Sequence, residues 1–231
     1  MLTDIEREAL TLSLKIAALS VAGSLPLGVA VALVLARLRF PGKALLDVLV
    51  HLPLVLPPVV TGYGLLLLLG QNGPLGAWLE RSLGIVLAFR WTGAALASAI
   101  MGFPLMVRAI RLSIEAIDRR LEQAAGTLGA NRPWVFVTVT LPLMAPGLIA
   151  GAILSFAKSL GEFGATITFV SNIPGETRTL ANAIFAFTQV PGGEAQTLRL
   201  CALSVALSVA ALLASEVLAR LARSRIDPHG A

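Results

Sequence analysis

Residues 118–142 read DRRLEQAAGTLGANRPWVFVTVTLP, the longest polar interruption in the central part of an otherwise apolar chain. An apolar stripe enters it at the spacing of one helix face, formed by Ile117, Leu121, Ala124 and Leu128. Gly129 is typical of a helix end, and Asn131 before Arg132-Pro133 is typical of a helix start. The stretch therefore predicts two short helices that meet at an angle. Its small residues leave room for another backbone, which favours a docking element.

The composition identifies the protein class. Of 231 residues, 56% are hydrophobic and 13% are charged, whereas soluble domains have roughly 45–50% apolar and about 25% charged residues. The charges are concentrated between long apolar runs, so the chain is predicted to be an integral membrane protein. The net charge of +5 comes from basic residues spread over short loops, where they set topology rather than bind nucleic acid.

Five stretches approach the length of about 20 apolar residues that a membrane-spanning helix requires. They cover approximately residues 9–36, 45–70, 91–112, 141–160 and 198–221. We expect residues 1–231 to form one all-α, polytopic membrane domain, with residues 113–140 as a loop outside the bilayer. The first stretch lacks the basic start of a signal peptide and is too long for one, which indicates a retained span.

The distribution of Lys and Arg predicts the orientation. Eleven of the 18 basic residues lie in the first loop, the third loop and the tail. The other side carries seven of the acidic residues. Because loops rich in Lys and Arg stay in the cytoplasm, we expect the N-terminus outside, the C-terminus in the cytoplasm, and residues 118–142 on the cytoplasmic side.

Two spans have unusual features. The second contains Pro53, Pro57 and Pro58, each of which removes a helical hydrogen bond and frees a carbonyl. This pattern favours a kinked, central helix beside a pathway or interface, although a purely structural kink remains open. The fourth contains Gly147 and Gly151 in a G-x-x-x-G pattern, which suits helix packing either within one subunit or between two.

The sequence contains no pattern for catalysis or metal binding. It has no P-loop, HExxH, GxSxG or Cys/His cluster, so we expect no enzyme activity and no energy source in this chain. Ionisable pairs at helical spacing within spans, Asp47–His51 and Lys158–Glu162, are interpreted as structural. The second pair adjoins glycines whose backbone could line a cavity.

Residues 123–142 resemble a known motif. The cytoplasmic loop of ABC importer permeases carries E-A-A-x-x-x-G, nine further residues and I-x-L-P. This chain has Gln123-Ala124-Ala125, Gly129, Val139 and Leu141-Pro142 at every matching spacing. Gln123 replaces the leading glutamate and Val139 replaces isoleucine. Glu122 is one residue from the position of the missing acid.

Longer segments resemble the molybdate permeases within that family. They are HLPLVLPPVVTGYGLL (51–66), GFPLMVRAIR (102–111), SLGEFGATITFVSNIPGETRTL (159–180) and QVPGGE (189–194). Sulfate and thiosulfate permeases share the SLGEFGA-like part but are typically longer, with an extra span. The resemblance implies a multi-pass protein of the bacterial cytoplasmic (inner) membrane that acts as a homodimer. Its implied partners are two cytoplasmic ATPase subunits, which bind ATP and Mg, and an external binding protein for molybdate or tungstate. No cofactor is expected in this chain.

This reading assigns two groups of candidate residues. The first group is expected to dock to the ATPase and to couple ATP hydrolysis to transport; it contains Leu121, Glu122, Gln123, Ala124, Ala125, Leu128, Gly129, Leu141 and Pro142. The pathway and gate are expected near Pro57, Pro58, Thr61, Gly62, Ser159, Gly161, Glu162, Phe163 and Gly164. A sulfate or other oxyanion permease is the main alternative. A secondary transporter or channel, and an intramembrane enzyme, are alternatives of other classes.

Overall fold

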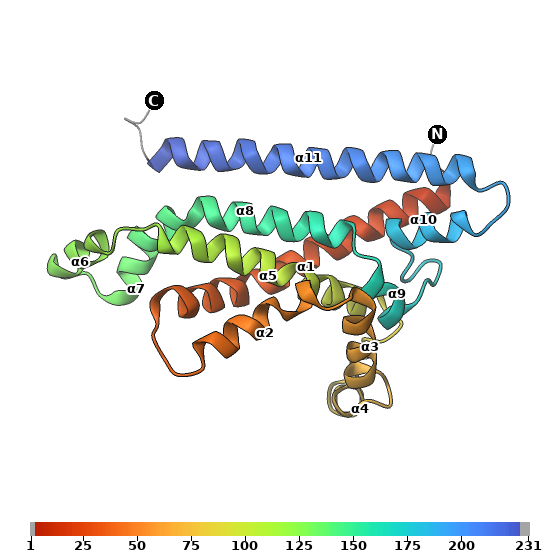
Figure 1. Ribbon diagram of the computed structural model, residues 1–231, viewed down its shortest axis with the longest axis horizontal. Helices are drawn as coiled ribbons and strands as arrows, with labels where there is room; N and C mark the ends of the chain where they lie inside the picture. Colours follow the sequence, from red (N-terminus) through yellow and green to blue (C-terminus); the bar gives the residue numbers. More distant parts are fainter. Residues whose placement is uncertain (1–2, 227–231) are drawn as a thin grey trace.

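The computed structural model describes residues 3–226, with the side chains of residue 215 and of residues from 219 onward excepted. The described residues form helices and connecting loops without a β-strand, as the all-α prediction required. The long helices run side by side along the molecule (Figure 1). The arginines of the tail, which the orientation argument counted, lie outside the described side chains.

Three long helices, α1 (Asp4–Arg37), α5 (Trp91–Glu115) and α8 (Leu141–Leu160), form the centre of the fold. Small residues let them approach. A Cβ added to Gly147 would lie 2.9 Å from the carbonyl oxygen of Ala109, and one on Gly151 would lie 2.9 Å from that of Met106. The G-x-x-x-G pattern therefore packs α8 against α5 of the same chain.

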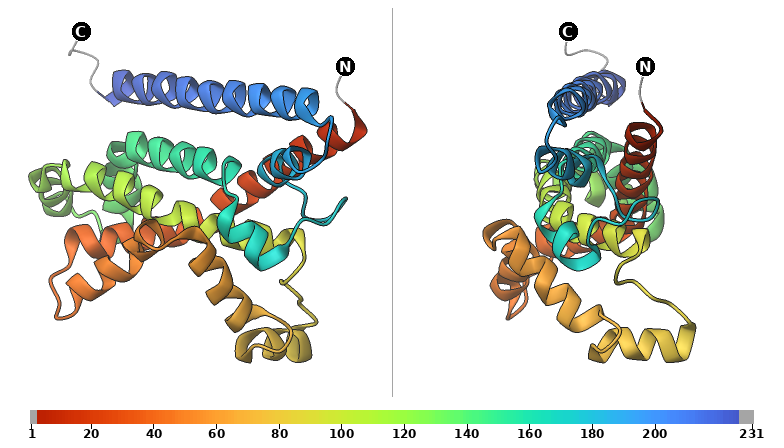
Figure 2. Two further views of the ribbon diagram at one scale, coloured as in Figure 1. Left: turned by 45° about the vertical axis from the view of Figure 1, so that its right-hand side comes forward. Right: turned by 90° about the vertical axis from the view of Figure 1, so that its right-hand side faces the viewer.

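The last helix, α11 (Glu194–Ile226), lies along one side of this bundle against α8 and α10 (Leu180–Thr188) (Figures 1 and 2). Its start is attached to the first helix by an ion pair. The buried carboxylate of Glu6 accepts a hydrogen bond from Arg199 Nε at 3.0 Å, and Arg199 Nη2 lies 2.9 Å from the same oxygen.

The second predicted span is broken rather than kinked. Helices α2 (Lys43–Val55) and α3 (Pro58–Leu69) meet at an angle of 112°. Pro58 restricts Pro57 to an extended conformation, with φ −54° and ψ 132°, and neither proline has an N–H to continue the helix. As a result, α3 and α4 (Pro74–Leu83) project from the bundle on the side opposite α11 (Figure 2).

The other predicted spans correspond to long helices, with shifted ends. Four helical stretches are long and apolar enough to cross a membrane, and a fifth is present if α2 and α3 count as one span. The fourth span is longer than expected. A π-helical turn, η1 (Phe136–Thr140), joins α7 (Arg132–Val135) to α8 without a break, so that Arg132–Leu160 is one 29-residue stretch. The predicted loop 113–140 is therefore helical at both ends.

Candidate functional site: a coupling element and a gate

The docking element predicted in residues 118–142, called the elbow from here on, contains two short helices. Helix α6 (Arg119–Thr127) begins at Asp118, whose carboxylate accepts a hydrogen bond from the N–H of Arg120 at 2.9 Å. It ends before Gly129, whose φ of +90° is a left-handed conformation that favours glycine. Asn131 then caps α7 by accepting a hydrogen bond from the N–H of Trp134 at 3.0 Å. The capping residues expected from the sequence are thus confirmed.

The outer surface of the elbow consists mainly of exposed leucines and small residues, which no other described part of the chain covers. Leu128 is 89% exposed and Leu121 is 50% exposed. Gln123 and Ala124 are exposed, and Ala125 is half-buried. A Cβ added to Gly126 or Gly129 would meet no atom within 4 Å. An exposed leucine pair beside small residues is suited to fit a groove on another protein.

Glu122 was predicted to lie on the docking surface, but its carboxylate is bonded to other elements of the chain. Its Oε1 accepts a hydrogen bond from Arg37 Nη2 at 2.8 Å and another from the hydroxyl of Thr140 at 2.7 Å. The carboxylate therefore points inward and joins α6 to the end of α1 and to η1. Arg37 and Thr140 were not predicted as site residues, because they lie 85 and 18 residues away in the sequence.

Leu141 and Pro142 connect the elbow to the membrane. Pro142 lies in the first turn of α8, and Leu141 packs against the core cluster that contains Met144. Because α7, η1 and α8 are continuous, no loop separates the second helix of the elbow from α8.

At the far end of α8, the chain meets α3 through α9 (Gly164–Val170). A Cβ on Gly62 would lie 2.5 Å from the carbonyl oxygen of Ala165, and one on Gly164 would lie 2.7 Å from Cβ of Pro58. Both glycines are needed for this close approach. The structure thus brings Gly62 to Ala165 and Pro58 to Gly164, so that these segments of the second and fourth spans are in contact, while their role in a gate stays a prediction.

Glu162 shapes the turn between α8 and α9. Its side chain is 1% exposed and accepts a hydrogen bond from Lys158 Nζ at 2.6 Å. Its second oxygen accepts a hydrogen bond from the N–H of Ala165 at 3.0 Å. The predicted pairing of Lys158 and Glu162 is confirmed, and the carboxylate also holds the first turn of α9. Phe163 packs on Phe185 of α10, with ring centroids 5.0 Å apart.

The remaining gate candidates have other surroundings. Ser159 is buried, and its hydroxyl is 2.8 Å from that of Ser20, so it contributes to the packing of α8 against α1. Pro57 is exposed at the bend, and Gly161 has open space around its Cα. The hydroxyl oxygen of Thr61 is buried without a hydrogen-bond partner among the described residues.

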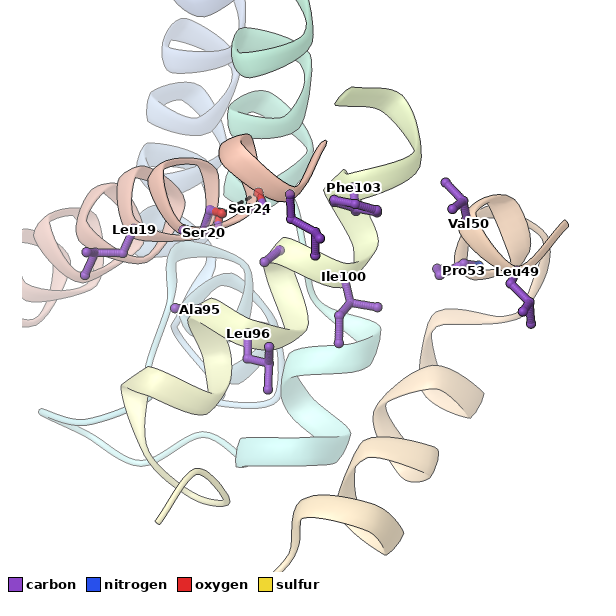
Figure 3. Close-up of a pocket in the computed structure, with 13 residues that line it drawn as sticks. Leu19, Ser20, Ser24, Leu49, Val50, Pro53, Ala95, Leu96, Ile100 and Phe103 are labelled. Atoms are coloured by element: carbon purple, nitrogen blue, oxygen red, sulfur yellow. Dashed lines mark hydrogen bonds between the residues drawn. The ribbon is translucent and has the colours of Figure 1, made fainter. Parts of the chain in front are cut away.

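A cavity of about 550 Å³ lies between α1, α2 and α5. Figure 3 shows apolar side chains from all three helices around it, with Ser20 and Ser24 on the α1 side. These two hydroxyls already donate to the carbonyl oxygens of Ala17 and Ser20. No cationic side chain lines the cavity, so it offers an oxyanion no counter-charge, and we do not assign it to the substrate.

The predicted pair Asp47–His51 is part of a larger network. Asp47 Oδ1 lies 3.3 Å from His51 Nδ1, and both carboxylate oxygens of Asp47 accept hydrogen bonds from Arg111 Nη1 at 3.1 Å. Arg111 also donates to Glu115 at 2.8 Å. The pair therefore joins α2 to α5, which supports its structural interpretation.

Comparisons with known proteins agree with this geometry. Residues 24–228 match the family model described as binding-protein-dependent transport system inner membrane component. The molybdenum transport system permease protein ModB of Escherichia coli (strain K12) is 59% identical over 225 residues, which cover 97% of this chain and 98% of that protein. The same protein of Haemophilus influenzae (strain Rd) is 54% identical over 221 residues, with 96% of each chain covered.

More distant similarities extend the comparison. The sulfate transport system permease protein CysT of Escherichia coli (strain K12) is 42% identical over 162 residues, which cover 70% of this chain and 58% of that protein. The crystal structure of a bacterial alginate ABC transporter, in complex with its alginate-bound periplasmic protein, has a chain of the same fold. Its TM-score is 0.73 at 16% identity, with 94% of this chain and 79% of that chain covered. This chain therefore belongs to the inner membrane components of binding-protein-dependent transport systems, and within them to the molybdenum transport permeases.

Proposed function

We propose that this chain forms the membrane pathway of an ATP-driven importer for molybdate. The observation that carries the proposal is the series of contacts from the uncovered elbow to the α3–α9 contact. Glu122 bonds α6 to η1, Arg132–Leu160 is one helical stretch, and Glu162 bonds the end of α8 to α9, which packs on α3. A channel or secondary transporter has no need of such a docking surface. The near full-length similarity to molybdenum transport permeases, compared with a shorter match to the sulfate permease, favours molybdate over sulfate.

The assembly that we infer contains two copies of this chain, two ATPase subunits and an external molybdate-binding protein. ATP and Mg would bind to the ATPases, since this sequence has no P-loop. The alginate transporter structure, which includes a periplasmic protein, supports the last of these partners. A second copy would face the α2–α3 segment, whose exposed apolar residues include Val55, Val59 and Tyr63.

We place the elbow in the cytoplasm. Basic residues gather at its end of the molecule, where Arg37 bonds Glu122 and where the lining of one cavity also includes Arg119 and Arg132. The positive-inside rule assigns such an end to the cytoplasm. The ATPases would then reach α6 directly.

In this mechanism, closure of the ATPases on ATP displaces α6. The Glu122 hydrogen bonds make α6, the end of α1 and η1 move together. Helix α8 carries the displacement through the bilayer to Glu162, which is bonded to the start of α9. Because α9 packs directly on α3, a shift there alters the spacing at Gly62 and Gly164. Packed helices of this kind move by small discrete steps rather than by bending.

The proposed function is tested by reconstitution of the permease with its ATPase and binding protein in proteoliposomes. We expect ATP-dependent accumulation of radiolabelled molybdate that requires the binding protein and resists competition by excess sulfate. Uptake of labelled sulfate in preference to molybdate would support the sulfate alternative. Uptake without ATP or the ATPase would refute the importer assignment and favour a channel or secondary transporter.

A further inference from the structure

A second feature of the elbow is a basic cavity on its membrane-facing side. The cavity has a volume of about 590 Å³ and lies between the end of α1, the helices α6 and α7, and η1. Three arginines line it, Arg37, Arg119 and Arg132, together with one acid, Glu122. Leu121 and Leu128 of the proposed docking surface do not line this cavity, whereas Gln123 and Gly126 do.

The charges of the cavity are not balanced within the chain. Glu122 is committed to Arg37 at 2.8 Å. The side chains of Arg119 and Arg132 form no hydrogen bond or ion pair with any residue that the structure describes. The cavity therefore presents two uncompensated guanidinium groups, which favour a ligand with phosphate-like oxygens.

A neighbouring cavity shows that this excess is specific. The cavity between α2 and α5 is also lined by two arginines, Arg108 and Arg111. It contains an equal number of acids, Asp47 and Glu115, both bonded to Arg111. The cavity between α2 and α5 therefore has as many acids as arginines, whereas the cavity beside α6 has two more arginines than acids.

The apolar lining indicates which phosphate-bearing molecule fits. Leu33, Val135 and Phe136 form the part of the wall contributed by α1, α7 and η1. Arg37 is in the last turn of α1, and η1 leads directly into α8, so the cavity lies at the ends of two membrane spans. A charged group above an apolar wall at this level matches a phospholipid, since basic pockets between helices at the cytoplasmic side bind anionic lipid headgroups.

We propose that this cavity binds the headgroup of an anionic phospholipid through Arg119 and Arg132. The bound lipid would hold α6 on the membrane surface beside the bonds of Glu122 to Arg37 and Thr140. Anionic lipid would therefore favour the coupled position of the elbow. This regulatory consequence rests on the proposed function, whereas lipid binding itself does not.

The test uses the purified permease–ATPase complex and phosphatidylglycerol as the probe, with bound lipid measured by native mass spectrometry. Each basic residue near a membrane surface contributes about fivefold in affinity. We therefore expect R119Q/R132Q to bind phosphatidylglycerol about 30-fold more weakly than the wild type. R119K/R132K should retain binding. R39Q/R108Q removes the same number of charges outside the cavity and should bind like the wild type.

Phosphatidylcholine serves as the comparison lipid without net charge, and inorganic phosphate and molybdate serve as competing anions. Phosphatidylglycerol retention by R119Q/R132Q equal to that of the wild type would overturn the proposal. Equal retention of phosphatidylcholine, or displacement of the lipid by millimolar phosphate or molybdate, would overturn the assignment to an anionic lipid. Failure of the assembled complex to bind phosphatidylglycerol would also overturn the proposal. A complex that binds the lipid through these arginines but imports no molybdate would refute the proposed function alone.

Discussion

Replacement of Glu122 by alanine should release α6 from the rest of the chain. The change removes the hydrogen bonds from Arg37, at 2.8 Å, and from Thr140, at 2.7 Å. A hydrogen bond to a charged group contributes about 1.5–3 kcal/mol. The side chains of Arg37 and Glu122 are 18% and 23% exposed, so solvent weakens the ion pair only in part. We therefore expect a local loss of about 2 kcal/mol, at the lower end of that range.

That loss corresponds to a rise of about 30-fold in the open population of α6. Hydrogen–deuterium exchange of the amides of Arg119–Thr127 measures this population directly. Amides in the middle of α5 should keep their protection, because the bundle does not depend on this contact. Molybdate uptake should fall while the permease still inserts and binds the ATPase.

A double-mutant cycle with R37Q isolates the ion pair. We expect a coupling energy of about 1–2 kcal/mol between positions 37 and 122, estimated from the same hydrogen-bond scale. E115A is the matched control, since Glu115 is a 41% exposed partner of Arg111 at the same end of the molecule. Unchanged exchange of α6 in E122A, or a coupling energy near zero, would refute the inward role of Glu122.

Two further predictions concern the gate and the topology. Gly62→Val should separate α3 from α9 and abolish uptake, because the new Cβ would lie 2.5 Å from the carbonyl oxygen of Ala165. The control Gly64→Val should transport nearly normally, because no atom lies within 4 Å of a Cβ added there. Normal uptake by Gly62→Val together with loss of uptake by Gly64→Val would contradict the role of the close contact. In a Cys201→Ser background, a cysteine at Arg119 should be protected from an impermeant thiol reagent added outside, and one at Glu176 should react. Labelling of the cysteine at position 119, with or without labelling at position 176, would contradict the proposed orientation.

The sequence predicted the helical elements well because their signals are local. Apolar length identified the spans, and the preference of Gly129 for a helix end and of Asn131 for a helix start identified the elbow. The 112° bend was beyond such reasoning. Three prolines predict a disruption, but its angle depends on how α3 packs against α9, a segment about 100 residues later in the chain.

The candidate site could be predicted only in part, because only some of its contacts are local in the sequence. Docking candidates on one face of α6 could be identified from helical spacing, and they are exposed as expected. Glu122 was grouped with them because it is adjacent to Gln123, yet its direction is set by Arg37 and Thr140 on distant elements. Ser159 was grouped with the gate by position, whereas its hydroxyl contacts Ser20. Long-range contacts of this kind leave no periodic signal in a single sequence.

The central claim, that the elbow couples ATP hydrolysis to transport, is tested most directly at Gly129. Its φ of +90° penalises any other residue, by about 1–2 kcal/mol. A Cβ added there meets no atom of this chain within 4 Å, so a bulky side chain would start into open space, where it would obstruct a docked partner. The pair Gly129→Ala and Gly129→Trp therefore separates backbone strain from obstruction of docking.

The decisive measurement is the number of molybdate ions imported per ATP hydrolysed in proteoliposomes. We expect Gly129→Ala to keep a ratio close to that of the wild type, with some loss of rate. Gly129→Trp should insert normally but show no uptake, whether the ATPase is idle or hydrolyses ATP without transport. A Gly129→Trp complex that imports molybdate at the wild-type ratio would contradict the coupling role of the elbow.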